Sequence, residues 1–226
     1  APRAAPVLQP EELLWRFPKT DQRKIAVVYE GPTTHYSLLT THPPREKTPP
    51  QAHNYILTIG TLCPRKNQLR LIEAFNMLPA PLRTTTKLIL VGGRGWCDDE
   101  IVERARRSEN VEWRRYVPQE KIDDLLCGAT VFACPSLAEG FGLPVLDALT
   151  LGVPVLTSNR SSLPEVAGDA ALLVDPEDTE AMAKGLERLL KDEALRGELR
   201  EKGPKQATKF GWEKTIDAML QAIRAY

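Results

Sequence analysis

Two acidic residues and two glycines lie close together in the stretch PSLAEGFGLPVLDAL, residues 135–149. Gly140 and Gly142 leave the backbone free to turn its amide groups toward an anion at the start of the following helix. Glu139 and Asp147 stand on either side of these glycines and could accept hydrogen bonds from sugar hydroxyls. Either acid alone could instead stabilise the helix N-terminus by about 0.3–1 kcal/mol. Together, the four residues favour a pocket for phosphate and hydroxyl groups, which is the chemistry of a nucleotide sugar.

Two adjacent cations, Arg65 and Lys66, precede another expected helix in the stretch GTLCPRKNQLRLIEAF. Asn67 follows them and is a candidate N-cap residue. Cations are unfavourable beside the positive end of a helix dipole, and a bound anion would remove that conflict. The pair therefore indicates a phosphate site, with solvated surface charge as the alternative.

Other motifs give weaker signals. Gly93 and Gly95 supply the first half of a dinucleotide-binding fingerprint, but its third glycine would fall at Asp98, whose negative charge would face a pyrophosphate. The sequence contains no phosphate-binding P-loop motif. The four cysteines lack metal-binding spacing, so we expect no metal site and interpret them as core residues of a protein from a reducing compartment.

The composition describes a neutral protein, long enough for one large domain or two small ones. The chain has 226 residues, with 30 basic and 30 acidic side chains. A net charge of zero gives no long-range attraction to nucleic acid, so we expect no nucleic-acid partner. The apolar runs fall short of the roughly 18 residues of a membrane-spanning helix, and the first residues resemble no signal peptide.

Strands and helices alternate from residue 52 onward, which predicts an α/β fold with a Rossmann-like parallel sheet, helices on both faces and a helical C-terminus. The expected strands are 54–60, 87–93, 111–117, 130–136, 153–159 and 170–175. The expected helices are 67–78, 98–108, 119–127, 143–151, 161–167, 178–191, 193–209 and 213–225. Ligands bind at the carboxyl ends of the strands in such a sheet, where both of the stretches described above lie.

Residues 1–51 differ from the rest of the chain, because nine of the 19 prolines fall within the first 50 positions. We expect a linker there, with one short helix at 11–17 and one buried strand at 24–29. We interpret 1–51 as the end of a preceding domain plus a linker, and 52–226 as a nucleotide-sugar-binding domain.

Several ordered blocks resemble the sugar-donor-binding half of the retaining GT-B glycosyltransferases, the family called glycosyl transferases group 1. The resemblance runs from about residue 23 to residue 226, and the block PRKN is similar to mannosyltransferases in particular. The blocks are KIAVVYEG, ILTIGTLCPRKNQLRLIEAF, LILVGG, YVPQEKIDDLLCGATVFACPSLAEGFGLPVLDAL, GVPVLTSNRSSLPEVAGDAALLVDPED and FGWEKT.

The resemblance implies catalytic roles for three residues. Arg65 and Lys66 would neutralise the diphosphate of the sugar donor and stabilise the departing nucleotide. Glu139 would be the first acid of the family's E-x7-E motif, near the donor sugar. Asp147 takes the place of the second acid, which holds the ribose hydroxyls. Because Asp is one methylene shorter than Glu, that contact would be longer, water-bridged or lost.

The resemblance also implies contacts with the sugar donor on neighbouring loops. The residues concerned are Gly60, Tyr116, Val117, Phe141, Gly142, Leu143 and Asp147. Residues 141–143 would face the sugar and the distal phosphate, and residues 116–117 would border the base. Arg115 stands where the family commonly has glycine, and it could narrow the pocket or contact the base.

For the whole enzyme, the resemblance implies transfer of a hexose with retention of configuration, without a metal or other cofactor. The sugar donor would be GDP-mannose, or a UDP-hexose as the second choice, and the acceptor a saccharide or a lipid-linked molecule. A preceding N-terminal domain would hold the acceptor, so this chain alone would bind the sugar donor without turning it over.

Two other interpretations remain open. One is a non-catalytic nucleotide-sugar-binding module of the same fold, with Asp147 and Arg115 as signs of lost activity, and the other is a GT-B sugar-nucleotide epimerase. We expect a cytoplasmic or membrane-peripheral protein. Its last helix would permit self-association through the apolar residues Trp212, Ile216, Met219, Leu220 and Ile223.

Overall fold

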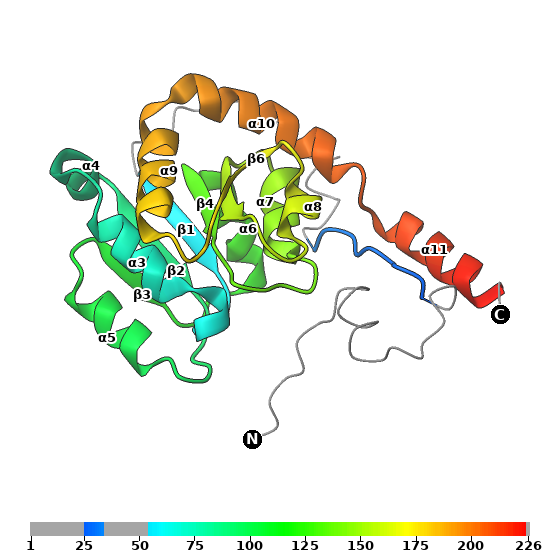
Figure 1. The fold of residues 1–226 in the computed structure, drawn as a ribbon, viewed down its shortest axis with the longest axis horizontal. Helices are drawn as coiled ribbons and strands as arrows, with labels where there is room; N and C mark the ends of the chain where they lie inside the picture. The colour runs from blue at the N-terminus through cyan, green and yellow to red at the C-terminus, as the bar shows by residue number, and fades with distance from the viewer. Residues whose placement is uncertain (1–24, 34–53, 225–226) are drawn as a thin grey trace.

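Six parallel strands form one sheet at the centre of the structure, a computed structural model that describes residues 25–33 and 54–224 (Figure 1). The strands lie in the order β3-β2-β1-β4-β5-β6. Their bounds are β1 Tyr55–Ile59, β2 Lys87–Val91, β3 Val111–Arg114, β4 Val131–Cys134, β5 Val155–Ser158 and β6 Ala171–Val174. β4 and β5 are buried along their whole length, as expected of strands covered on both faces.

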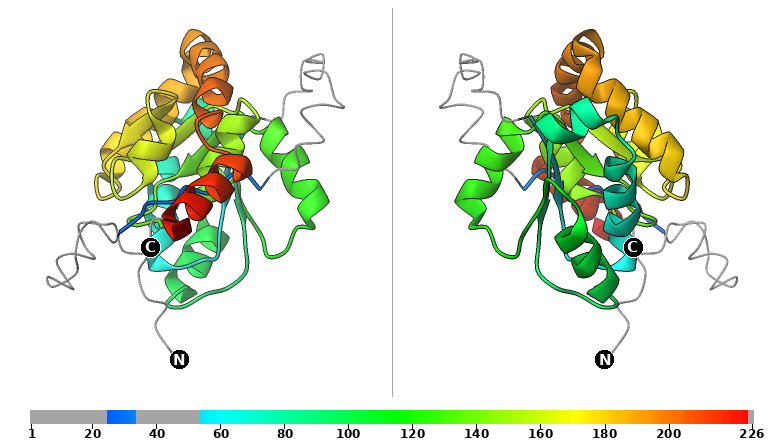
Figure 2. Two further views of the ribbon diagram at one scale, coloured as in Figure 1. Left: turned by 90° about the vertical axis from the view of Figure 1, so that its right-hand side faces the viewer. Right: turned by 90° about the vertical axis from the view of Figure 1, so that its left-hand side faces the viewer.

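Helices cover both faces of the sheet (Figure 2). The first face carries α3, α5 and α9, and the second carries α6, α7 and α8. Their bounds are α3 Gln68–Asn76, α5 Asp99–Arg107, α9 Thr179–Lys191, α6 Gln119–Gly128, α7 Leu143–Thr150 and α8 Leu163–Ala167. An apolar core fills each side, with Phe75 fully buried in the first and Phe132 in the second. Burial of a side chain of this size contributes about 1.5–3 kcal/mol.

Two helices follow α9. α10 (Glu193–Ala207) begins where the Asp192 carboxylate accepts a hydrogen bond from Leu195 N at 2.9 Å, and it crosses from α9 to α7. α11 (Trp212–Arg224) extends away from the sheet (Figure 1). It leaves five apolar side chains exposed: Trp212, Ile216, Met219, Leu220 and Ile223. Within the described ranges, no helix is both long and apolar enough to cross a membrane.

This architecture confirms the expected α/β fold. Every strand and helix expected after residue 52 is present, with ends that differ by a few residues. Two further elements are too short to show an apolar period in the sequence, the 3-10 helix η2 (Pro64–Lys66) and α4 (Ala80–Thr85). The helix expected at 11–17 and most of the proline-rich linker lie outside the described residues.

The strand expected at 24–29 is wrong for its described part, because residues 25–30 form no strand. A strand requires a hydrogen-bonded neighbour, and this segment lies beside α11 instead of the sheet. Trp212 Nε1 donates a hydrogen bond to Pro32 O at 3.0 Å. The side chain of Val27 is exposed, so the apolar run is not the buried parallel strand that its composition predicts.

Candidate functional site

Between β1 and β4 the strand order reverses direction. The two strands pair in parallel, with Ile56 opposite Val131 and Leu57 opposite Phe132. α3 follows β1 on one face of the sheet and α7 follows β4 on the other, so the two connecting loops diverge at this point. Ligands of open α/β sheets bind at such a topological switch point. We therefore place the candidate site where these two loops leave the sheet.

An ion cluster of three residues joins the two loops. Arg65 Nη1 lies 2.7 Å from Glu139 Oε2, and Lys66 Nζ lies 2.5 Å from Glu139 Oε1. The backbones are also connected, because Leu137 N donates to Arg65 O at 2.8 Å. Arg65 Nη1 further donates to Ala138 O at 2.7 Å. The structure thus brings together the three residues for which the sequence resemblance implies catalytic roles.

The ion cluster keeps a formal charge of +1, because two cations share one carboxylate. The side chain of Glu139 is only 7% exposed, whereas those of Lys66 and Arg65 are 14% and 38% exposed. Glu139 relieves the conflict between the cations and the start of α3, a role that the sequence assigned to a bound anion. A phosphate group approaching the exposed side of Arg65 would still meet net positive charge.

Three serines hold Glu139 in place. Ser136 Oγ donates to Glu139 Oε1 at 2.6 Å. In the loop after β5, Ser161 Oγ and Ser162 Oγ donate to Glu139 O at 2.6 Å and 3.1 Å. Burial alone would raise the pKa of Glu139, but the two cations and the Ser136 hydroxyl outweigh burial and hold that pKa below its usual value. The carboxylate is therefore ionised and fixed at neutral pH.

Asn67 connects the two loops from the start of α3. It occupies the N-cap position, as expected, but its side chain makes no capping hydrogen bond. Its Nδ2 instead donates to Pro135 O at 2.9 Å and to Pro176 O at 2.6 Å. The backbone of Asn67 is left-handed, with φ of 60°, a conformation that asparagine tolerates better than most residues. Asn67 therefore ties the turn that carries Arg65 and Lys66 to the end of β4.

Gly60 lies directly after β1, where two loops approach closely. Its φ is 151°, and a Cβ at this position would lie 3.1 Å from Lys66 Cε. A Cβ on Gly92 would lie only 2.1 Å from Gly60 O. The small size of both glycines lets the loop after β2 pack against the loop after β1 and leaves room for the extended Lys66 side chain.

The loop that leads into α7 is shaped by a glycine and by aromatic packing. Gly142 is the N-cap of α7 with φ of 104°, and a Cβ there would lie 2.7 Å from Leu163 Cδ2. The ring of Phe141 packs edge-on against Phe210, with 5.4 Å between centroids. Leu143 begins α7 and is partly buried. Because the Phe141 ring packs against Phe210, a ligand would contact the backbone of this loop and not the ring.

Asp147 is buried within α7, with 8% exposure. Its Oδ1 accepts a hydrogen bond from Thr33 N at 2.7 Å, and its Oδ2 accepts one from the Thr33 hydroxyl. The structure therefore places Asp147 against segment 25–33, while the first acid, Glu139, meets the two cations.

The turn after β3 carries the residues expected to border the base. Tyr116 is 82% exposed, and Val117 packs at the edge of the second core. The guanidinium carbon of Arg115 lies 4.9 Å from the centroid of the Trp113 ring, a cation–π arrangement. Trp113 on β3 thus holds the Arg115 side chain at the start of this turn.

A salt bridge fills the glycine-rich loop after β2. Arg94 Nη2 lies 2.7 Å from Asp98 Oδ1, and Gly95 N donates to Asp98 Oδ2 at 3.2 Å. The hydrogen bond from Arg94 is the main cause that lowers the pKa of Asp98. This geometry supports a structural interpretation of the loop.

Across residues 25–33 and 54–224, no three His, Cys, Asp or Glu side chains gather as a metal site requires.

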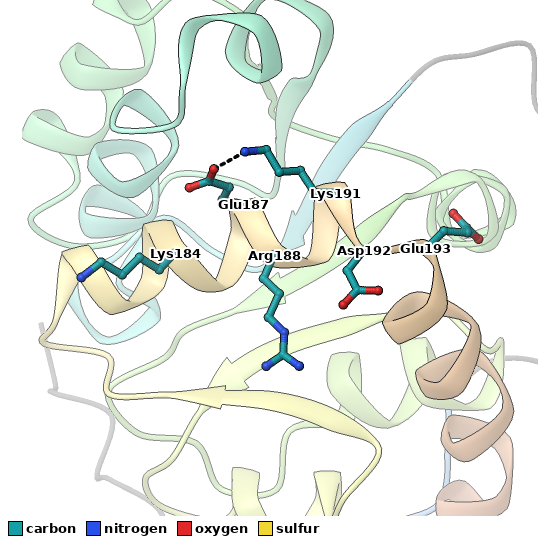
Figure 3. A pocket seen from close by; sticks show the side chains of 6 residues that line it. All are labelled: Lys184, Glu187, Arg188, Lys191, Asp192 and Glu193. Carbon is teal, nitrogen blue, oxygen red and sulfur yellow. Dashed lines mark hydrogen bonds and ion pairs between the residues drawn. The ribbon is translucent and has the colours of Figure 1, made fainter.

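A charged hollow of about 580 Å³ lies along α9 and the start of α10 (Figure 3). Three basic and three acidic side chains line it: Lys184, Arg188, Lys191, Glu187, Asp192 and Glu193. Their charges balance, and some of them serve the helices themselves, since Glu187 pairs with Lys191 and Asp192 caps α10. We interpret this hollow as charged helix surface and keep the candidate site at the switch point.

Sequence reasoning missed the polar residues that support the site: Thr33, Ser136, Ser161 and Ser162. Ser136 stands three positions before Glu139, and the serine pair follows a strand at its carboxyl end, so position in the sheet could have identified them. Thr33 carries no such signal, because its partner is 114 positions away.

Comparisons with known proteins agree with this architecture. The sequence family described as glycosyl transferases group 1 matches residues 42–206, well over half of the chain. Over 175 residues, the chain is 43% identical to O-antigen chain mannosyltransferase B of Escherichia coli, covering 76% of this chain and 45% of that protein.

Solved structures show the same fold. WaaG, a glycosyltransferase involved in lipopolysaccharide biosynthesis, matches with a TM-score of 0.70 at 24% identity, over 84% of this chain and 54% of that one. HepE of Anabaena, in complex with UDP and glucose, matches with a TM-score of 0.69 at 18% identity, over 77% of this chain and 49% of that one. The chain thus spans about half the length of these proteins.

Proposed function

Because the chain belongs to the glycosyl transferases group 1 family, we propose that its switch-point site binds the nucleotide-sugar donor of a glycosyltransferase. The observation that carries this proposal is the ion cluster of Arg65, Lys66 and Glu139. It offers net positive charge where ligands of this sheet type bind, and the Arg65 side chain remains open to solvent.

The sugar donor in this proposal is GDP-mannose. The support is the 43% identity to a protein named as a mannosyltransferase. A UDP-hexose is the alternative, because the solved structure of HepE contains UDP and glucose. Both ligands share the diphosphate that the cations would contact.

In the proposed reaction, the bond between the sugar and the diphosphate breaks and negative charge develops on the departing nucleoside diphosphate. Arg65 and Lys66 would stabilise that charge without a metal ion. The sugar carbon would form its new bond to a hydroxyl oxygen of the acceptor, with retention of configuration, and the hydroxyl proton would pass to the departing phosphate or to solvent. Preorganised charge costs little reorganisation at the moment of reaction, and Glu139 and Ala138 O already hold both cations in position.

The proposed surroundings of the sugar donor follow from the same loops. Gly60 and residues 141–143 would contact the sugar and phosphates, and residues 116–117 would contact the base. We further propose that an acceptor-binding domain completes the enzyme and that 52–226 is the donor-binding domain. A non-catalytic module of the same fold is the second candidate, because Asp147 is engaged by Thr33.

Calorimetric titration with GDP, GDP-mannose, UDP and UDP-glucose tests the proposal. We expect Arg65→Ala and Lys66→Ala to weaken nucleoside-diphosphate binding by about tenfold or more, since each removes a charge-assisted contact. Arg107→Ala is the matched control, because Arg107 is exposed on α5 and pairs with Glu103 at 2.7 Å. Equal affinities in the Arg65 and Arg107 variants, or no binding by the unmodified chain, would contradict the proposal.

A further inference from the structure

Segment 25–33 is fastened to several elements of the domain. Thr33 meets Asp147 on α7 through both its N–H and its hydroxyl. Tyr29 donates its hydroxyl to Glu165 on α8 and accepts, at its backbone oxygen, a hydrogen bond from Thr215 Oγ1 of α11 at 2.5 Å. The segment therefore contacts three helices, α7, α8 and α11, that follow it in the chain by more than a hundred residues.

The carboxylate of Asp147 is hydrogen-bonded to this segment. Both of its oxygens accept hydrogen bonds from Thr33, and the residue is buried. The resemblance implies a ribose contact at this position, but a ribose hydroxyl would have to share or displace the bonds to Thr33. An aspartate is also shorter than the glutamate of the family motif and extends less far from α7.

The same segment also contacts the loop that carries Glu139. The ring of Tyr29 lies 6.2 Å from that of Phe141 and 5.6 Å from that of Phe210, measured between centroids. Phe141 O accepts a hydrogen bond from Ser162 Oγ at 2.9 Å, and Ser162 also holds Glu139 O. Tyr29 thus packs against Phe141, which lies two residues after Glu139 in the same loop.

We infer that Asp147 is a positioning residue that fastens segment 25–33 to α7 through Thr33, and that this docking fixes the loop 139–142 at the sugar-donor site. The inference rests on the proposed function for its ligand. Its structural half, that Thr33 restrains the loop, stands independently of any ligand. Thr33 acts through Asp147 and through the segment that places Tyr29 on Phe141.

The test compares three substitutions within the segment by calorimetry with GDP. Thr33→Val keeps the size of the side chain and removes its hydroxyl, Thr33→Ser keeps the hydroxyl, and Val27→Ala alters an exposed side chain. We expect Thr33→Val to weaken GDP binding at least about fivefold, a typical coupling between sites, while the other two variants bind as the unmodified chain does. A Thr33→Val variant with lowered melting temperature and unchanged GDP affinity would overturn the inference.

A second ligand separates the positioning role from a ribose contact. If Asp147 acts by holding Thr33, Asp147→Asn should weaken the binding of GDP and the binding of 2′-deoxy-GDP by the same factor. A loss confined to GDP would assign Asp147 to the ribose and overturn the inference.

Amide hydrogen exchange of the unliganded chain distinguishes failure of this inference from failure of the proposed function. Thr33→Val should speed exchange in residues 139–142, whereas Val27→Ala should not. If the unmodified chain binds no nucleotide, the proposed function fails and this exchange measurement alone decides the inference. Unchanged exchange in Thr33→Val would refute it.

Discussion

Lys66 Nζ lies 2.5 Å from Glu139 Oε1, although the two residues are separated by 73 positions. The contact crosses the point where the strand order reverses, so it links the loop after β1 to the loop after β4. Burial of Glu139 opposes its ionisation, and the two neighbouring cations reverse that preference. The charge of the candidate site is therefore coupled to the stability of the fold.

Glu139→Gln should destabilise the chain at neutral pH by about 1–3 kcal/mol, because two cations lose their buried partner. The pKa of Glu139 is lower in the folded chain than its unfolded value of about 4.3, so its stabilising effect is present above that pH. It is lost as the pH falls through the folded pKa. Urea unfolding from pH 7 to pH 3 should show the difference between the two proteins shrinking.

Glu103→Gln is the control for that experiment, since Glu103 forms an exposed pair with Arg107. Exposed pairs of this type contribute about 0.2–1 kcal/mol. If the loss of unfolding free energy caused by Glu139→Gln did not change with pH, the stabilising effect of Glu139 would not come from its ionised form.

Asn67→Ala should lower the free energy of unfolding by about 2–3 kcal/mol, because it removes two buried hydrogen bonds and leaves alanine with φ of 60°. Asn67→Gly removes the same hydrogen bonds without the backbone strain. Chemical denaturation of both variants separates the two contributions. A glycine variant as unstable as the alanine variant would show that the backbone conformation contributes nothing.

Gly142→Ala should destabilise the chain by about 1–2 kcal/mol, since φ of 104° is unfavourable for alanine and its Cβ would approach Leu163. It should also weaken GDP binding, because this glycine shapes the loop that begins α7. Gly197→Ala is a matched control within α10, where the added Cβ meets nothing within 4 Å apart from the adjacent residues and the backbone of its own helix. That control should raise stability by about 0.5–1 kcal/mol. Thermal unfolding measures the melting temperatures of the two variants. Equal changes in melting temperature would show that the backbone conformation of Gly142 does not matter.

The sequence predicted the sheet and the edge at which the site residues lie for the same physical reason. Buried parallel strands are long apolar runs, and their carboxyl ends must meet at one edge, so the two loops that carry Arg65, Lys66 and Glu139 could be placed at that edge from strand positions alone. The ion pairs among these residues were not predicted, because the sequence assigned the two cations to a bound anion. Asn67 was predicted in its position but not in its contacts, because its carbonyl partners, Pro135 and Pro176, come from loops whose paths a sequence pattern does not define.

The strand expected at 24–29 shows where local pattern fails. An apolar run of this length predicts a buried strand only if the sheet has an edge to receive it, and tertiary contacts decide that. Thr33 and Asp147 pair across 114 positions, and neither residue type nor spacing indicates the contact. Such long-range polar pairs depend on how the chain returns over the sheet, which no local rule describes.

Tyr55→Phe should reduce stability at neutral pH by about 0.5–1.5 kcal/mol, because the Tyr55 hydroxyl donates to Leu125 O at 2.6 Å. Burial raises the pKa of Tyr55 to about 12, so its stabilising effect is present below the unfolded pKa of about 10 and is lost as the pH rises through 12. The difference between the two proteins should therefore narrow above pH 10 in urea unfolding. Tyr116→Phe, at an exposed tyrosine, should leave stability unchanged at neutral pH.

Exposed apolar side chains on α11 should make the chain associate with a second copy as its concentration rises. Ile216 is 54% exposed and Leu220 is 44% exposed, on a helix that extends away from the sheet. Burial of such a face between two copies removes apolar surface from water, which favours association. Ile216→Lys and Leu220→Lys should abolish the effect, whereas Gln221→Lys adds the same charge at a polar position and should not. Light scattering over a concentration series measures the mass, and a single-chain mass at the highest concentration would count against this surface.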